Sequence, residues 1–244
     1  MNLIITGCEY VGKTTLAERV SQWIADTMGT SRSFHDHFTL PSPEVRDRDG
    51  ELFMQMSPDF KERFQRYMIE YHLLPAFFTD PDHMLTGFHI EEAVFAPLYY
   101  GYGGEGQYAA RSSFARSIEK RILEIAPDTI LVLLKASPEA IRQRMKENPR
   151  PRDQAGRRDG ILQDKDVEHV LQAFQNEFDA TLLRKRIQID NTDLTPEETL
   201  QEFVENAQKH ISQRDRLRIL THQALLETGE AKSGEVAHIK TRNY

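Results

Sequence analysis

Apolar and polar residues alternate along this chain in blocks that predict strands and helices in turn. Short apolar runs, which are typical of buried parallel strands, occupy 2–6, 83–90, 128–136 and 186–190. Segments with apolar residues three and four positions apart, which are typical of amphipathic helices, occupy 13–28, 59–78, 111–126, 137–147, 164–183 and 195–212. This alternation predicts a three-layer α/β fold in which helices flank a mainly parallel sheet.

The remaining segments complete this layout. A short run at 31–38 predicts a second strand that ends near Asp36, and the aromatic, glycine-rich segment 96–108 predicts a loop. The basic segment 148–160, which holds prolines and glycines, predicts another loop. Residues 1–212 therefore form the predicted main domain, and 213–244 are expected to add a helix and a loose polar tail.

The corner between the first strand and the first helix has the pattern of a P-loop. Gly7–Thr14 reads GCEYVGKT and fits G-x-x-x-x-G-K-[ST] without a gap. The glycines let successive N–H groups point at phosphate oxygens, and the positive end of the following helix points at the same anion. The lysine is expected to reach the outer phosphates, and Thr14 to offer its hydroxyl to Mg²⁺. The motif predicts that ATP and Mg²⁺ are bound by Gly7, Tyr10, Val11, Gly12, Lys13, Thr14 and Thr15.

An alternation that begins with a P-loop unit predicts a five-stranded parallel sheet in the order 2-3-1-4-5. Ligands of such sheets bind beyond the carboxyl ends of the strands, where Asp36, Glu91 and Glu92 are expected. One carboxylate is needed to hold a metal-bound water, and one to take the proton of an alcohol acceptor. Asp36 and Glu91 are the candidates for these roles, with Glu91 also a candidate metal ligand and Glu92 a candidate substrate residue. Which glutamate faces the metal stays open, because neighbours at a strand end point opposite ways.

Arginines are concentrated in the basic segment and in the helix before it. Arg144, Arg150 and Arg152 are candidates for neutralising the charge that spreads over a phosphoryl group during transfer. Two other interpretations are a solvated charged surface and a nucleic-acid patch. The second is weaker because no aromatic residues are interleaved with these arginines.

The amino-acid composition bears on the cellular location of the protein and on the classes of partner that it can bind. The 244 residues are 39% hydrophobic and contain no apolar run long enough for a membrane span. A single cysteine, Cys8, and a first strand with no signal-like segment before it lead us to expect a cytoplasmic protein. The net charge of −7 argues against a broad nucleic-acid surface. A homodimer stays open.

The motifs and the order of predicted strands and helices together resemble the thymidylate kinase and deoxynucleoside kinase group of P-loop kinases. The resemblance in the order of elements extends from about 1 to 212. Besides the P-loop, the resemblance rests on Pro127-Asp128 before a strand and on Ser137-Pro138-Glu139, which opens a helix that carries Arg144. It implies an arginine-rich lid at about 148–160 and an adenine pocket that includes Asn191 and Thr192. The chain departs from the group in having Glu91-Glu92 where an acidic residue is usually followed by arginine, so the acceptor pocket is expected to differ.

The acceptor side is expected to use aromatic faces and one of two arginines. Aromatic rings stack on flat rings and glycines allow close approach, which makes the segment around 99–104 a candidate wall for a nucleobase. Arg63 or Arg66 could bind an acceptor phosphate; if they point away, an alcohol acceptor is favoured. The candidate substrate residues are Arg63, Arg66, Glu92, Tyr99, Tyr100 and Tyr102.

The sequence thus predicts an ATP-dependent phosphotransferase that moves the γ-phosphate of Mg·ATP to a nucleoside, a nucleoside monophosphate or a related small acceptor. A P-loop ATPase or nucleotide switch that acts on a macromolecular partner is the alternative. A kinase that acts on nucleic acid is a further alternative.

Overall fold

The computed structural model describes residues 1–32, 35–37, 52–78, 82–149, 161–231 and 234–237. Two of the candidate lid arginines, Arg150 and Arg152, lie outside the described residues. So does most of the predicted lid itself, at 150–160. The backbone of Asp36 is described, but its side chain is not.

The centre of the molecule is a parallel sheet of strands β1 (Asn2–Thr6), β3 (His35–His37), β4 (His83–Gly87), β5 (Ile130–Lys135) and β6 (Lys185–Asp190). The order across the sheet is β3-β4-β1-β5-β6, and every neighbouring pair is parallel. Four longer strands make up most of the sheet, with the three-residue β3 at one edge. This arrangement follows the predicted order when β3 is counted as the second strand.

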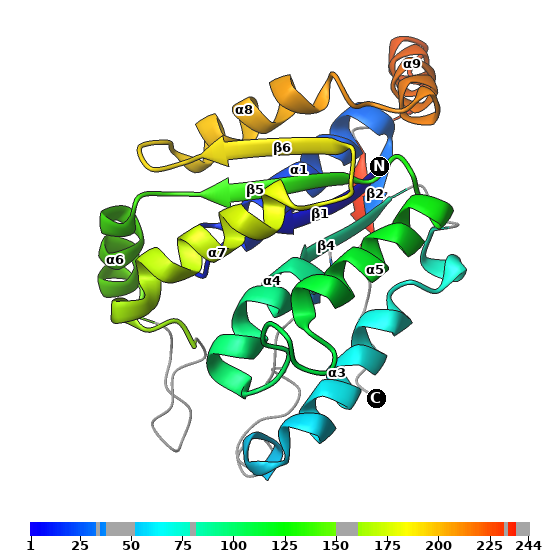
Figure 1. Cartoon of the computed structure of the whole chain (residues 1–244). Coiled ribbons are helices and arrows are strands. Elements are labelled where there is room, and N and C mark those ends of the chain that lie inside the picture. The colour runs from blue at the N-terminus through cyan, green and yellow to red at the C-terminus, as the bar shows by residue number, and fades with distance from the viewer. Residues whose placement is uncertain (33–34, 38–51, 79–81, 150–160, 232–233, 238–244) are drawn as a thin grey trace.

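Helices cover both faces of the sheet (Figure 1). Helix α1 (Lys13–Met28) packs against α8 (Pro196–Ala207) and α9 (Gln213–Glu227) on one face. On the other face, α4 (Phe88–Phe95) packs against α5 (Arg111–Ile125) and α7 (Val167–Asp179). Helix α6 (Pro138–Glu147) follows β5, and α3 (Pro58–Tyr71) precedes β4. The predicted parallel sheet flanked by helices is confirmed. None of the described helices combines the length and apolar character that a membrane crossing requires.

Two predicted segments end earlier than expected. The helix expected to reach Phe78 stops at Tyr71, and a separate 3-10 turn covers Pro75–Phe78. A proline cannot continue the hydrogen-bond ladder of the helix before it, which accounts for the break. The third strand stops at Gly87, where φ is 75°, and α4 begins at Phe88. Glu91 and Glu92 are therefore helical, and the prediction that they end a strand is wrong.

The predicted loop at 96–108 is partly wrong as well. One π-helical turn, Ala96–Tyr100, extends α4 and ends at Gly101, which has a φ of 74°. Pro97 lies inside this turn and lacks the N–H that a regular helix would use, a usual cause of such a widened turn. Tyr99 and Tyr100 are consequently fixed by a helix rather than carried by a free loop.

The second predicted strand is divided in two. Besides β3, residues Thr30–Arg32 form β2, which pairs in parallel with β7 (Glu235–Ala237) in a separate two-stranded sheet. Part of the C-terminal tail that was predicted to be loose is thus a strand.

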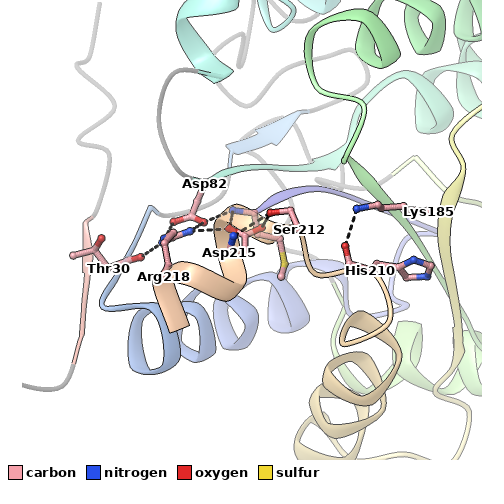
Figure 2. Close-up of polar contacts among 8 residues, drawn as sticks. Thr30, Asp82, Lys185, His210, Ser212, Asp215 and Arg218 are labelled. Atoms are coloured by element: carbon pink, nitrogen blue, oxygen red, sulfur yellow. Dashed lines mark hydrogen bonds and ion pairs between the residues drawn. The ribbon is translucent and has the colours of Figure 1, made fainter. Parts of the chain in front are cut away.

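A buried ionic cluster ties α9 to the amino end of the main sheet (Figure 2). We call the Met1 amino group with Asp82, Asp215 and Arg218 the amino-end cluster. The Met1 nitrogen lies 2.5 Å from Asp82 and 3.2 Å from Asp215, and Arg218 donates to Asp82 at 2.8 and 2.9 Å. Arg218 also donates to the backbone oxygen of Thr30. The cluster joins the starts of β1 and β4 to the helix that follows α8.

Candidate phosphate-binding site

The P-loop occupies the corner between β1 and α1, as predicted. An added Cβ at Gly7 would lie 2.4 Å from the backbone oxygen of Leu134, so only glycine fits there. Gly12, with a φ of 94°, precedes α1 and makes no side-chain cap bond. The first turn of α1 carries no acidic residue. The uncapped N–H groups and the positive helix end therefore suit an anion such as a phosphate group.

Lys13 and Glu91 meet at this corner. The Lys13 Nζ lies 2.9 Å from Glu91 Oε2 and donates to the backbone oxygens of Gly7 and Cys8. Burial alone would lower the pKa of Lys13, but the Glu91 carboxylate outweighs it and holds that pKa above its usual value. The structure thus brings together the predicted phosphate-binding cation and the predicted carboxylate.

The first turn of α1 also fits a bound Mg·ATP. Thr14 and Thr15 are exposed on that turn, with Glu91 close to its start. Mg²⁺ usually keeps several waters and takes one or two protein ligands besides phosphate oxygens. Thr14 and Glu91 offer the hydroxyl and the carboxylate for that purpose, and when bound, Mg²⁺ would neutralise phosphate charge.

The loop after β6 closes the other side of the P-loop. The Asn191 amide donates to the backbone oxygen of Val11 at 2.7 Å, and its Oδ1 accepts from Arg144 at 3.1 Å. Arg144 also donates to the backbone oxygen of Asn191, and Thr192 accepts from the Ser137 N–H. Arg144, which was predicted to neutralise charge on the transferred group, is thus held beside the predicted adenine-side loop, and this position favours a role at the base of a nucleotide.

A group of charged side chains, buried except for Arg66, whose side chain is 32% exposed, lies between α3, α4 and α5. We call Glu62, Arg66, Glu92, Tyr102 and Arg111 the carboxyl-edge cluster. Arg111 lies 3.0 Å from Glu62 and 3.2 Å from Glu92, while Arg66 lies 2.6 Å from Glu62. The Tyr102 hydroxyl donates to Glu92 at 3.0 Å. Burial raises the pKa of Glu92 to about 7, although Arg111 acts in the opposite direction.

The sequence analysis missed two members of this cluster, Glu62 and Arg111. Arg111 opens α5 and is 1% exposed, and its guanidinium lies over the rings of Tyr102 and Phe114. A Cβ at Gly103 would lie 2.4 Å from Arg111 Cγ, so this glycine makes room for the arginine. In the sequence, an arginine at the start of an amphipathic helix is expected at the surface, and Gly103 comes close to it only in the folded structure, so no local signal marked Arg111 as buried.

The predicted acceptor-side residues have different surroundings. Arg63 is exposed on α3. Tyr99 donates to Asp166 and accepts from the Gln163 N–H, which fixes it to the segment before α7. Tyr100 is 1% exposed, and its hydroxyl has no hydrogen-bond partner among the described residues. Tyr100 thus has a polar atom available for a ligand, whereas Tyr99 holds two segments together.

Glu9 is a third residue that sequence analysis missed. Its carboxylate accepts from the backbone N–H groups of Ile161 and Leu162, both at 3.2 Å. The P-loop is thereby tied to the chain that follows the predicted lid. The neighbouring Cys8 is fully buried, and burial raises the pKa of its thiol, as expected of a small structural residue.

Comparisons with known proteins find similarity in three dimensions only. Neither the family models nor the curated proteins give a match. A deoxyadenosine kinase from M. mycoides, solved with bound dATP, superposes with a TM-score of 0.55 at 12% identity over 85% of this chain and 100% of that one. A thymidylate kinase from Candida albicans gives a TM-score of 0.52 at 13% identity over 85% of this chain and 91% of that one.

The chain therefore shares the overall fold of these two kinases. In this fold the phosphate-binding corner, the Lys13–Glu91 pair and the carboxyl-edge cluster all lie beyond the carboxyl ends of β1 and β4. That edge is where doubly wound parallel sheets bind their ligands. The candidate site therefore consists of a phosphate side, built by the P-loop and Asn191, and an acceptor side, built by α3, α4 and α5.

Proposed function

We propose that this protein is an ATP-dependent phosphotransferase that moves the γ-phosphate of Mg·ATP to a nucleoside, a nucleoside monophosphate or a related small acceptor. The observation that carries the proposal is the contact between Lys13 of an uncapped P-loop helix and Glu91 of α4. This contact supports the proposal because a lysine suited to bind phosphate lies beside a carboxylate near the carboxyl edge of the sheet, where such folds bind ligands. The similarity to a deoxyadenosine kinase and a thymidylate kinase supports the same class of acceptor.

Each side chain of the site has a definable role in this proposal. Lys13 and the N–H groups of the P-loop would bind phosphate oxygens, and Thr14 would hold Mg²⁺, which would neutralise phosphate charge. With phosphate bound to Lys13, the Glu91 carboxylate would be available to the metal or to the proton of the acceptor. Asn191 and Arg144 position the nucleotide base, and the predicted lid arginines Arg150 and Arg152 are proposed to neutralise charge on the transferred group.

ADP release with Mg·ATP tests the proposal. The protein would be incubated with a panel of nucleosides and nucleoside monophosphates, with Lys13→Ala as the catalytic control. We expect ADP formation that depends on an acceptor, a phosphorylated product in equal amount, and neither with the variant. ADP release that is the same with and without every acceptor would identify a stand-alone ATPase instead.

A further inference from the structure

The charges of the carboxyl-edge cluster balance one another. Arg66 and Arg111 supply two positive charges, and Glu62 and Glu92 supply two negative charges. Glu62 contacts both arginines, and Glu92 contacts Arg111. The neighbouring pair Lys13 and Glu91 is balanced in the same way. Among the described residues, the acceptor side therefore has no buried arginine with an uncommitted charge.

Burial makes this balance important. The side chains of Arg111 and Glu92 are 0% and 1% exposed, and that of Glu62 is 4% exposed. A dianionic phosphate placed beside them would have to displace a carboxylate from its arginine, which leaves a buried charge without a partner. Arg63, the other arginine of α3 considered for an acceptor phosphate, is exposed.

The same region offers polar atoms that suit an uncharged ligand. Among the described residues, Glu92 Oε2, Arg111 Nη1 and the Tyr100 hydroxyl are buried and make no hydrogen bond. Buried polar atoms in native proteins are nearly always hydrogen-bonded, so such a group marks a place where a ligand or water completes the set. One atom accepts, one donates, and the hydroxyl does both.

We infer, on the basis of the proposed function, that the phosphate acceptor is an uncharged compound with a hydroxyl group, such as a nucleoside, rather than a nucleoside monophosphate. Glu62, Glu92 and Arg111 are then specificity-determining residues, because their balanced charges exclude an acceptor phosphate. An alcohol must lose its proton to react, and Glu91 is the carboxylate that receives it. The acceptor oxygen bonds to the γ-phosphorus, the bond from that phosphorus to the β,γ-bridging oxygen breaks, and ADP leaves.

Matched pairs of nucleosides and their 5′-monophosphates test this inference. Product formation and ADP release would be measured for both members of each pair. We expect the wild-type kcat/KM to be at least about tenfold higher for the nucleoside, the scale of one nearby unpaired charge.

Two charge-removing variants test the role of the cluster itself. Glu62→Gln and Glu92→Gln each leave one arginine charge without its carboxylate. We expect each to shift the nucleoside-to-monophosphate ratio of kcat/KM about tenfold or more toward the monophosphate. Tyr102→Phe removes only a hydroxyl from Glu92 and should raise the KM for the acceptor while the KM for ATP stays constant. Lys120→Ala changes an exposed residue of α5 and serves as the matched control.

The outcomes separate this inference from the proposed function. A wild-type protein that prefers the monophosphates would overturn the inference and leave the phosphotransferase function standing. Folded Gln variants with unchanged acceptor ratios would show that the cluster is only structural. If no member of any pair becomes phosphorylated, the proposed function fails and the inference fails with it.

Discussion

Two buried ionic clusters lie at opposite ends of the parallel sheet, and they differ in how completely they are hydrogen-bonded. In the amino-end cluster, Asp82 binds both the Met1 amino group and Arg218, and Asp215 binds Met1, Arg218 and Ser212. None of its atoms is among the buried groups without a partner in the described part of the chain. The carboxyl-edge cluster contains such groups in Glu92 and Arg111.

We propose that this difference separates a cluster that only stabilises the fold from one that binds a ligand. A cluster whose members satisfy one another gains nothing from a ligand and contributes to the free energy of unfolding. A cluster with unpaired atoms at the ligand-binding edge has its hydrogen bonds completed from outside. The amino-end cluster should therefore affect stability alone, and the P-loop and carboxyl-edge cluster should affect turnover and specificity.

The largest expected effect is on stability, at the amino end. Asp82→Ala leaves the Met1 amino group and Arg218 buried without this carboxylate, a change that costs about 3–5 kcal/mol in comparable buried pairs. For a chain of this size that corresponds to a fall in Tm of about 10 °C. Thermal unfolding would measure it, and kcat/KM at a permissive temperature should stay at the wild-type value.

Asp128→Ala is the matched control for that change. Asp128 pairs with Lys185 at 2.7 Å near the same end of the sheet, but its side chain is 60% exposed. Exposed pairs contribute about 0–1 kcal/mol, so Tm should move by only a few degrees. Equal losses in the two variants would remove the distinction between a buried cluster and a surface pair.

The next effect is on turnover, at the phosphate side. Lys13→Ala removes the cation that faces the P-loop carbonyls and Glu91, and kcat should fall about 10²–10³-fold, as when one charge-stabilising donor is lost. Lys13→Ala also leaves the largely buried Glu91 carboxylate without its cation, so Tm should fall as well, and kcat is compared at a temperature where both proteins are folded. Steady-state ADP release together with thermal unfolding measures both. Near-normal turnover in this variant would contradict the assignment of the loop.

A pH-dependent effect is expected from Glu92. The groups that face it are Arg111 from α5, Tyr102, and Glu62 and Arg66 from α3. Because its pKa rises from 4.5 to about 7 on folding, the folded state keeps a proton that the unfolded state releases between these values. The stability contribution is present at low pH and is lost as the pH rises toward 7.

Glu92→Gln removes the titrating carboxyl group and should therefore abolish this fall in stability with rising pH. Between pH 5.5 and 8 the free energy of unfolding of the wild type should fall by about 1 kcal/mol or more relative to the variant. Urea unfolding at the two pH values measures the difference. Parallel pH dependence in the two proteins would mean that Glu92 does not titrate with a raised pKa.

The smallest effect is expected at the adenine side. Asn191→Ala removes the bonds to Val11 and Arg144, and the KM for ATP should rise several-fold to about tenfold, the scale of one or two hydrogen bonds. Arg144→Ala should act in the same direction, with kcat less affected than KM. Asp193→Ala, an exposed change two residues away, is the control. A loss in kcat without a change in KM would instead assign Arg144 to the transferred phosphate.

The phosphate side was predictable because its signals are local. The first strand and helix have the predicted bounds, Asn2–Thr6 and Lys13–Met28, and the spacing of two glycines, lysine and threonine specifies a backbone conformation within eight residues. The acceptor side was predicted less well. A φ of 75° at Gly87 and the proline in the π-helical turn moved Glu91, Glu92, Tyr99 and Tyr100 from a strand end and a loop onto one helix.

The sequence by itself determined the order of strands and helices and the position of the P-loop between β1 and α1. These follow from hydrophobic periodicity and from motifs whose residues are neighbours in the chain. Only the tertiary structure decided that Glu91 meets Lys13 and that Arg111 joins Glu62 to Glu92. It also decided that the C-terminal helix is anchored by Asp82. Charges up to 214 positions apart pair because burial makes an unpaired charge costly, and that cost depends on the surroundings, which no local pattern encodes.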